Sequence, residues 1–434
     1  MAASRIRAGA VMPGFDEVRT KRKRRLIALR LDLTVQQTTA AALRLSARNP
    51  AHWQAEVEVL WGGDESIAFL SVRSAFAAML EAVAWPEKSE VLVTGINIVD
   101  MVRIIDSLGH VAVPIDIDPE TLAPDIAEIA RRIGPATRAL VVAHLFGGSI
   151  DLSEVMNVAR SRDVMVIEDC AQAYTTRRAR DPRESDVRLF SFGLLKTGTA
   201  LGGALVDVAD LGLREKMRNI QTSWRRQSRL SYAAKVSKAF FFLLLQRPVA
   251  YGFFSRLCAA AGSSSAVVLR KLTRGFGRGD AAALLRGLRL QPCTPLLAML
   301  AWRLSSENGH RISRRATAGN RMMARLAGLE QADLTRIGYS QARHSHWLVP
   351  VSVPDPEGLT RELARAGFDS HGASNIIAIG GPRATSTISG LVFLPCYPEM
   401  TDEARDRVCQ VVLSHCRGRG EGKVAAGPHS RERG

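Results

Sequence analysis

The sequence VMVIEDCAQA at residues 164–173 and the sequence LFSFGLLKTGTALGGALV at residues 189–206 decide the fold that we expect. Each begins as an apolar run with the length of a buried strand. The first run ends at the acid Asp169, and the second carries Ser191 and, five residues later, Lys196. The pattern predicts neighbouring strands of one sheet, with an acid, a serine and a lysine at the strand ends.

Lys196 is flanked by Leu194, Leu195 and a stretch rich in alanine and glycine, so we expect its amine to be desolvated. Burial lowers the pKa of a lysine and increases the fraction of neutral amine, which Schiff-base chemistry uses. Asp169 at a buried strand end needs a cationic partner, and a protonated pyridine nitrogen would be one. Taken alone, Asp169 is a strand-end cap and Lys196 a surface lysine; together their spacing favours pyridoxal phosphate chemistry.

This region resembles the DegT/DnrJ/EryC1/StrS family of pyridoxal phosphate-dependent aminotransferases. The resemblance rests on three signatures, which are VIEDCAQA at residues 166–173, Ser191-Phe192 followed by Lys196, and the pair Gly202-Gly203. It implies an α/β protein of fold type I, with a mainly parallel central sheet flanked by helices and a smaller α+β C-terminal domain.

The resemblance also implies a role for four residues of the two stretches. Lys196 would hold the cofactor covalently and, once released by the substrate, move the proton between the substrate α-carbon and the cofactor. Asp169 would keep the pyridine nitrogen protonated. Gln172 would approach the phenolic oxygen of the cofactor, and Ser191 would join its phosphate site.

A further phosphate-binding segment is expected between a strand at 67–70 and a helix that starts near Ala75. Such a junction collects backbone N–H groups and the positive end of a helix at one point. In the family this place often reads Ser-Gly-Thr-x-Ala. The resemblance therefore implies phosphate contacts from the segment that stands here, Ser71, Val72, Arg73 and Ser74, with Val72 in the place of the usual glycine.

Strands and helices alternate from residue 90 to residue 150, as in a parallel sheet with ligands at the strand carboxyl ends. We predict strands over 91–94, 111–116 and 139–144, and helices over 99–108 and 126–133. Family members usually have an aromatic residue after the first of these strands, stacked on the cofactor; here Ile98 stands in its place and would pack flat on the ring. For His144, both a hydrogen-bonded core position and a place near the cofactor are open.

The length of 434 residues is enough for two or three domains. The six cysteines have no C-x-x-C spacing and the nine histidines no ligand-like spacing, so we expect reduced thiols, a cytoplasmic location and no metal site. No uncharged apolar run approaches the roughly 20 residues that span a bilayer. The first residues also lack the pattern of a signal peptide.

The formal net charge of +17 is concentrated in segments outside these motifs. Residues 222–290 alone carry thirteen basic side chains and one acid. The predicted organisation is a basic N-terminal arm (1–58), a large cofactor-binding domain (59–221), a helical basic and apolar insert (222–285), a small C-terminal domain (286–416) and a disordered tail (417–434).

The insert at 222–285 combines apolar aromatic stretches with lysine and arginine. This composition suits helices that lie on an anionic membrane, at the inner membrane face for a cytoplasmic protein. Covering a long or apolar substrate, or forming an extra helical subdomain packed on its own chain or on a dimer mate, are alternatives. Nucleic acid is not expected as a partner, because no binding motif organises the basic residues and the apolar content is too high.

Residues 286–416 resemble the small domain of the family, and LPCYPEMT at residues 394–401 resembles a segment near the family's end. The family normally donates an asparagine across the dimer to the phosphate of the neighbouring subunit. The resemblance implies a homodimer in which Arg289 takes that role, since a guanidinium binds phosphate strongly.

These residues predict an aminotransferase that moves an amino group from an amino-acid donor to a keto group, by resemblance that of a keto-sugar or a related biosynthetic intermediate. A pyridoxal phosphate-dependent dehydratase or lyase is the enzymatic alternative. Lys196 argues against it, because dehydratase relatives with this fold replace that lysine with histidine. The second alternative is a non-catalytic, membrane-associated relative.

Overall fold

The structure, a computed structural model of the chain, describes residues 26–27, 30–174, 185–263, 265, 268–269, 272, 280–306, 309–327, 333–341, 343–373 and 376–424. The basic cluster at 21–25 and the end of the predicted tail therefore lie outside the described residues. Within the described part, no helix has both the length and the apolar character needed to cross a bilayer.

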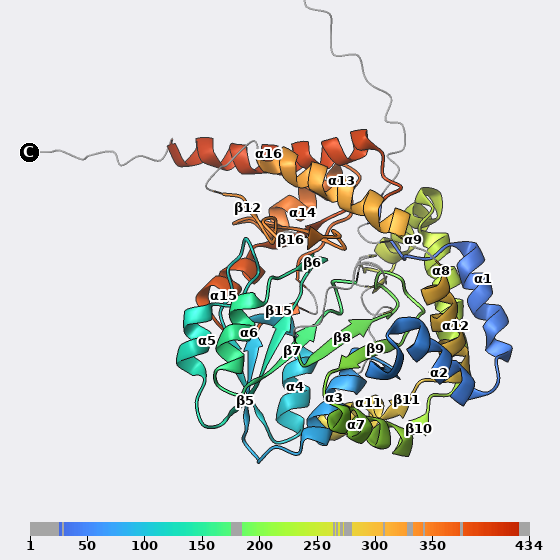
Figure 1. Cartoon of the computed structure of the whole chain (residues 1–434). Helices are drawn as coiled ribbons and strands as arrows, with labels where there is room; N and C mark the ends of the chain where they lie inside the picture. Colours follow the sequence, from blue (N-terminus) through green and yellow to red (C-terminus); the bar gives the residue numbers. More distant parts are fainter. Residues whose placement is uncertain are drawn as a thin grey trace, which may run out of the picture.

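A seven-stranded sheet in the order β1-β9-β8-β7-β5-β2-β4 forms the centre of the large domain (Figure 1). Its strands are β1 (Ser66–Phe69), β2 (Glu90–Thr94), β4 (Val111–Ile115), β5 (Thr137–Ala143), β7 (Met165–Asp169), β8 (Val187–Ser191) and β9 (Ala204–Val208). Only β9 runs antiparallel to its neighbours. The predicted mainly parallel sheet is confirmed, and each strand predicted between residues 90 and 150 is present.

Alternate residues of the strands face two helical layers, as the period of two in a strand requires. Val91 and Val93 belong to the core on one face, and Leu92 to the core on the other. The first face is covered by α3 (Val72–Val83), α4 (Val99–Ser107), α7 (Leu211–Ser223) and α11 (Ala281–Leu288). The second is covered by α5 (Ile126–Arg132) and α6 (Ser153–Arg160), and towards β1 by α2 (Pro50–Trp61), α8 (Arg229–Leu245) and α12 (Thr294–Ser305).

The small domain is the predicted α+β unit. The strands β12 (Thr335–Arg336), β14 (Val349–Ser352) and β16 (Leu391–Leu394) pair antiparallel, and α13 (Gly309–Ala327), α14 (Pro356–Arg365) and α16 (Asp402–Val424) lie on them (Figure 1). Helix α16 continues beyond residue 416, where the sequence predicts the tail to begin. Its packed first half provides the helical turns, and adding residues to an existing helix costs little.

Two short strand pairs connect the domains. One joins β13 (Arg343–His344) to β6 (Gly148–Ser149), and the other joins β15 (Ile376–Ala378) to β3 (Ile96–Ile98). Helix α15 (Pro382–Ser389) continues from the second pair, and Asp116, just after β4, accepts hydrogen bonds from the backbone N–H groups of Arg383 and Ala384 at its start. Both pairs place the small domain over the carboxyl ends of the central strands.

The predicted N-terminal arm is part of the folded body from residue 31 onward. Leu31 and Leu33 are buried, and α1 (Val35–Leu43) and α2 pack on α8 and α12, with the short helices η1 (Arg44–Ser46) and η2 (Gly63–Glu65) between and after them. The basic charge of residues 1–31 suggested a solvated segment, but the following apolar residues supply a helix face that must be covered.

The insert is helical, as predicted, and the strands at its two ends lie side by side. Strand β10 (Arg225–Arg226) pairs parallel with β11 (Leu290–Gln291), which closes the excursion formed by α8 and α9 (Pro248–Ala260). Apolar residues along one face of α8, among them Tyr232, Val236 and Phe242, are buried in a core shared with α12. The insert is therefore integrated into the large domain through one face of α8.

Candidate active site

Three of the predicted site segments meet at one edge of the sheet. Strands β1, β7 and β8 run in the same direction, because β9 between β1 and β8 is antiparallel to both. Ser71 follows β1, Asp169 ends β7 and Ser191 ends β8. The carboxyl ends of parallel strands share one edge, so these residues lie where ligands bind in open α/β sheets.

Lys196 lies in the loop after β8, in a turn closed by a hydrogen bond from its backbone N–H to Gly193 O at 2.9 Å. Its side chain is partly exposed, but protein atoms surround the amine. This desolvation lowers the pKa of Lys196 to about 8, while the negative charge of Asp169 acts to raise it and the positive charge of Arg73 to lower it. Because the charges of Asp169 and Arg73 both act on the amine of Lys196, the three residues lie near one another.

An aromatic side chain from the small domain lies against this amine. Lys196 Nζ is 4.2 Å from the ring centroid of Trp347, and Trp347 Nε1 donates a hydrogen bond to Leu195 O at 2.9 Å. Sequence reasoning did not single out Trp347, because it is 152 positions away from Leu195 and no local motif links the two. The ring covers one side of the amine, whereas Ile98 gives no aromatic contact from the large domain.

Asp169 is buried, and its Oδ1 accepts a hydrogen bond from Ala171 N at 3.0 Å. Burial raises the pKa of this carboxyl, although the Ala171 hydrogen bond and the charge of Lys196 act to lower it. A buried carboxyl with a raised pKa is stabilised as the anion when a cation binds next to it. A protonated pyridine nitrogen would provide that partner.

His144 occupies a hydrogen-bonded core position, one of the two alternatives left open by the sequence. Its Nδ1 accepts a hydrogen bond from Ile150 N at 3.0 Å, so Nε2 carries the proton and donates to Glu168 Oε2 at 2.9 Å. Possible ligand atoms of His144, Glu168 and Cys170 lie within 4.8 Å of one another. Burial, however, raises the pKa of the Cys170 thiol well above its usual value, which disfavours the thiolate that a metal requires.

Gln172 is oriented by the loop that follows β5. Its side-chain Oε1 accepts a hydrogen bond from Phe146 N at 3.0 Å. Its Nε2 donates to none of the residues that the structure describes, and the amide therefore has a donor available for a ligand oxygen. This orientation is compatible with the predicted approach to a phenolic oxygen.

The predicted phosphate segment forms the start of α3. Ser71 is the N-cap, and its Oγ accepts a hydrogen bond from Ser74 N at 3.1 Å and lies 2.9 Å from Ser74 Oγ. Arg73 Nε pairs with Asp100 Oδ2 at 2.8 Å. Val72 is helical and does not adopt the positive φ that favours glycine, so the side chain at this position strains nothing in the backbone. The helix start thus presents N–H groups, two hydroxyls and a guanidinium.

One buried side chain beside Ile98 lacks a partner. Asn97 is 2% exposed, and its Oδ1 accepts a hydrogen bond from Ile98 N at 2.8 Å. Its Nδ2 has no hydrogen-bond partner among the described residues. An unsatisfied buried donor is costly, and a bound ligand oxygen would relieve that cost.

Arg289 lies away from the sheet edge of its own chain. Its guanidinium pairs with Glu81, with Nη2 and Oε1 3.0 Å apart, and its side chain is 43% exposed. Glu81 stands nine residues after the start of α3, which is roughly 13 Å along the helix axis. A contact with phosphate through Arg289 would thus require a second subunit, as the sequence interpretation states.

The residues at the sheet edge fit pyridoxal phosphate. Lys196 supplies an amine with a lowered pKa, and Asp169 supplies a buried carboxyl that makes no salt bridge with a described residue. Two side chains, Asn97 and Gln172, have donors that no described residue uses, and α3 begins with a cradle for an anion.

Comparison with known proteins identifies a family and several similar proteins. The sequence model of the "DegT/DnrJ/EryC1/StrS aminotransferase family" matches residues 34–274. The chain is 32% identical over 150 residues to L-glutamine:2-deoxy-scyllo-inosose aminotransferase of Micromonospora echinospora, which covers 34% of this chain and 35% of the relative. It is 31% identical over 177 residues to UDP-N-acetyl-3-dehydro-alpha-D-glucosamine 3-aminotransferase of Acidithiobacillus ferrooxidans, which covers 40% of this chain and 48% of the relative. The chain thus matches less than half of the length of these curated relatives.

Solved structures extend the likeness to nearly the whole chain. The aminotransferase TlmJ from Streptoalloteichus hindustanus superimposes with a TM-score of 0.67 and 18% sequence identity, over 91% of this chain and 100% of the other. At this identity the likeness shows the fold alone, and that fold is type I, as predicted.

We expect Lys196 to react with an aldehyde at a rate that rises with pH and reaches half of its maximum near pH 8, because a lowered pKa leaves more amine neutral. An ordinary lysine has only about one neutral amine in 300 at that pH. Arg73→Gln removes a repelling charge and should raise the midpoint, whereas Asp169→Asn removes an attracting charge and should lower it. Reductive trapping with pyridoxal, followed by mass spectrometry of the Lys196 peptide, measures the rate. A wild-type midpoint near pH 10, or shifts of the same sign in both variants, would contradict this assignment.

Proposed function

The chain belongs to the DegT/DnrJ/EryC1/StrS aminotransferase family, and on that premise we propose that it is a pyridoxal phosphate-dependent aminotransferase. The proposed reaction moves an amino group from an amino-acid donor to the keto group of a sugar or a related biosynthetic intermediate. The observation that carries the proposal is the enclosed amine of Lys196, with a pKa of about 8, beside the buried carboxyl of Asp169.

Each residue at the sheet edge has a defined task in this proposal. Lys196 would hold the cofactor through its neutral amine and, once released by the substrate, would take up and return the proton of the substrate carbon. Asp169 would hold a proton at the ring nitrogen, and Gln172 would donate its Nε2–H to an oxygen of the cofactor. Pyridoxal phosphate, when bound, supplies an electron-withdrawing ring that stabilises negative charge at the substrate carbon.

Binding and enclosure are assigned to the surrounding side chains. Ser71, Ser74 and Ser191 bind the phosphate together with the start of α3, where backbone N–H groups and the helix dipole favour an anion. Arg73 contributes a positive charge, and Trp347 shields one side of the amine from water. Ile98 packs on the ring in the place of the aromatic residue that the family usually has.

A keto-sugar acceptor is supported by the names of the relatives. One matched relative acts on 2-deoxy-scyllo-inosose with L-glutamine as donor, and another acts on a UDP-linked keto-sugar. We infer an acceptor of this class, a cyclic polyol with one keto group. Which carbon carries the keto group is decided by contacts outside the residues assigned so far.

The activity is tested by the visible absorption of the purified protein. We expect an absorption band from the lysine-bound cofactor in the wild type and its loss in Lys196→Ala, with an unchanged circular dichroism spectrum. Amino transfer should fall by at least about 10²-fold in the variant, because the residue that moves the proton is absent. The absence of a band in the wild type after addition of pyridoxal phosphate would overturn the proposal. Release of ammonia without an aminated product would favour the dehydratase or lyase alternative.

We further propose a homodimer in which Arg289 reaches the phosphate site of the partner subunit. The support is its position, partly exposed and paired with Glu81 on the outer part of α3. Arginine is well suited to grip phosphate with two hydrogen bonds. The proposal predicts that a site needs Lys196 from one subunit and Arg289 from the other.

Hybrid dimers test this arrangement. Arg289→Ala and Lys196→Ala should each be inactive alone, and mixing them after subunit exchange should restore roughly a quarter of the wild-type activity. Half of the dimers are then hybrids, and each hybrid has one site with both side chains. No recovery in a mixture shown to contain hybrids would contradict a role across the interface.

The exposed face of the insert is proposed to contact an anionic membrane at its inner face. Phe240, Phe241, Leu244, Phe253 and Leu257 are exposed, and the rings of Phe241 and Phe254 lie 6.1 Å apart, which joins α8 and α9 into one surface. Lys238 is on α8, Arg256 is on α9, and Arg247 lies between the two helices. Apolar side chains with basic neighbours favour an interface between water and anionic lipid.

Vesicle sedimentation tests the membrane contact. We expect the protein to pellet with vesicles that contain phosphatidylserine and not with neutral ones, and less at high salt. The variant Phe240→Ser/Phe241→Ser/Phe253→Ser should lose most of this binding, whereas the matched variant Val35→Ser/Leu43→Ser, on the exposed face of α1, should keep it. A deletion of the insert would be uninformative, because α8 belongs to the core. Equal pelleting of the two variants would refute the contact.

A further inference from the structure

A narrow hollow lies next to the Lys196 loop. It contains about 340 Å³ of space between the atoms, part of which is solvent at its mouth. Arg30, Asp32, Thr197, Arg311 and Arg315 are among the charged or polar side chains that line it, and Trp347 forms a further wall. The hollow therefore suits one small group, or the end of a larger molecule.

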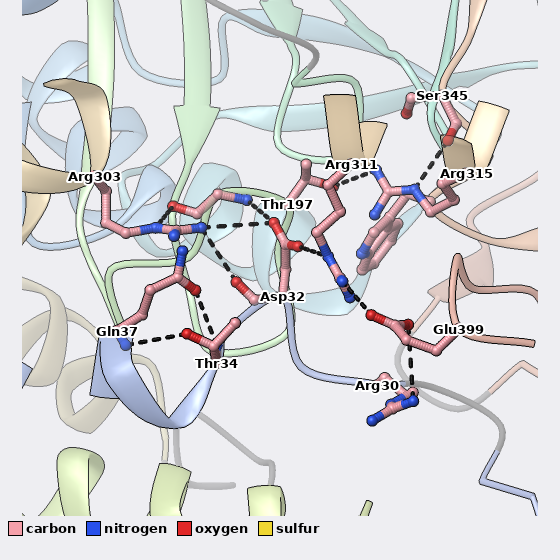
Figure 2. A network of polar contacts seen from close by, with 12 residues as sticks. Arg30, Asp32, Thr34, Gln37, Thr197, Arg303, Arg311, Arg315, Ser345 and Glu399 are labelled. Atoms are coloured by element: carbon pink, nitrogen blue, oxygen red, sulfur yellow. Dashed lines mark hydrogen bonds and ion pairs between the residues drawn. The ribbon is translucent and has the colours of Figure 1, made fainter. Parts of the chain in front are cut away.

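Positive charge exceeds negative charge around this hollow (Figure 2). Asp32 accepts hydrogen bonds from Arg311 Nε and from Gly198 N, both at 2.6 Å, and lies 3.7 Å from Nη2 of Arg303. Burial acts to raise the pKa of Asp32, but the charge of Arg303, the Gly198 hydrogen bond and the charge of Arg311 outweigh it and hold this pKa below its usual value. Asp32 is thus ionised and fully engaged.

The second carboxylate is also engaged. Glu399 pairs with Arg311 and lies 3.8 Å from Arg30. Three guanidinium groups, those of Arg30, Arg303 and Arg311, therefore share these two carboxylates in the network of Figure 2.

Arg315 is the guanidinium that this network leaves without a carboxylate. It is 8% exposed, and it donates from Nε to Ser345 O at 3.0 Å and from Nη2 to Thr197 Oγ1 at 2.8 Å. Within the described residues no carboxylate oxygen lies within 4.0 Å of it, and Nη1 has no acceptor. A buried charge without a counter-ion is costly, and an anion in the hollow would remove that cost.

The hollow and the reacting amine share their walls. Leu195 and Thr197, on either side of Lys196, line the hollow, and so does Trp347, whose ring lies 4.2 Å from the amine. Lys196 itself does not line the hollow, so a group bound to Arg315 would lie near the amine without contacting it. It would belong to a part of the substrate remote from the reacting carbon.

We propose that Arg315, with Arg311 at the mouth of the hollow, binds an anionic group of the substrate away from the carbon that reacts. The group is an oxyanion, either a phosphate of the acceptor or the second carboxylate of a dicarboxylic amino donor. A guanidinium binds both through paired hydrogen bonds. Binding energy from such a remote group helps to hold the substrate for the reaction. The link to a substrate rests on the proposed function, whereas the anion site itself does not.

Calorimetric titration of the full-length protein tests the site directly, with inorganic pyrophosphate and with glutarate as probes. We expect one probe to bind the wild type, Arg315→Gln to weaken that binding by about tenfold or more, and Arg315→Lys to lose less because it keeps the charge. Arg321→Gln is the matched control, since Arg321 is on the same helix but exposed, and its ion-pair partner among the described residues is Asp402. Its affinity should equal that of the wild type.

The outcome also names the source of the anion. Preference for pyrophosphate assigns the site to the acceptor, and preference for glutarate assigns it to the donor. Binding of neither probe by the wild type, or equal binding by the wild type and a folded Arg315→Gln, overturns the site. The titration does not depend on the cofactor. An absent absorption band would therefore refute the proposed function, while the titration would still test whether the hollow binds an anion.

Discussion

The balance of forces on the amine of Lys196 is the constraint on which the site depends. The surrounding protein disfavours the charged amine, Asp169 favours it and Arg73 opposes it, with a resulting pKa of about 8. Asp169 is in turn buried, and burial raises its own pKa. A ligand that brings a carbonyl to the amine and a protonated nitrogen to the carboxyl would offset the cost of burial at both residues.

The loop that carries Lys196 is held by four distant parts of the chain. Trp347 binds the carbonyl of Leu195, Arg315 binds the hydroxyl of Thr197, Asp32 accepts from Gly198 N, and Tyr232 donates to Ala200 O, with distances of 2.6 to 2.9 Å. These partners come from the small domain, the N-terminal segment and the insert. The position of the amine is thus fixed by the complete fold, since no single element supplies it.

The sequence was sufficient to predict which residues meet at the sheet edge. It was insufficient to predict the distant residues that hold the Lys196 loop. Asp169 and Ser191 could be placed together because each ends an apolar run, and parallel strands bring their carboxyl ends to one edge. Arg315, by contrast, is 118 positions from Thr197, and Asp32 is 166 positions from Gly198. No spacing or periodicity encodes contacts of that range. The basic charge before residue 31 also favours a solvated segment and gives no sign that Leu31 and Leu33 are buried. Their burial places Asp32, which lies between them in the sequence, at the hollow.

Helix α8 of the insert has a buried face and an exposed face with different surroundings. On α8 the buried face carries Tyr232, whose hydroxyl reaches Ala200 in the Lys196 loop at 2.9 Å, while the opposite face exposes Phe240, Phe241 and Leu244. A substitution on the buried face disturbs the loop and therefore the amine. A substitution on the exposed face meets only solvent or a partner. The proposed membrane contact and the support of the Lys196 loop can consequently be tested separately by choosing the face, although both faces belong to the same helix of 17 residues.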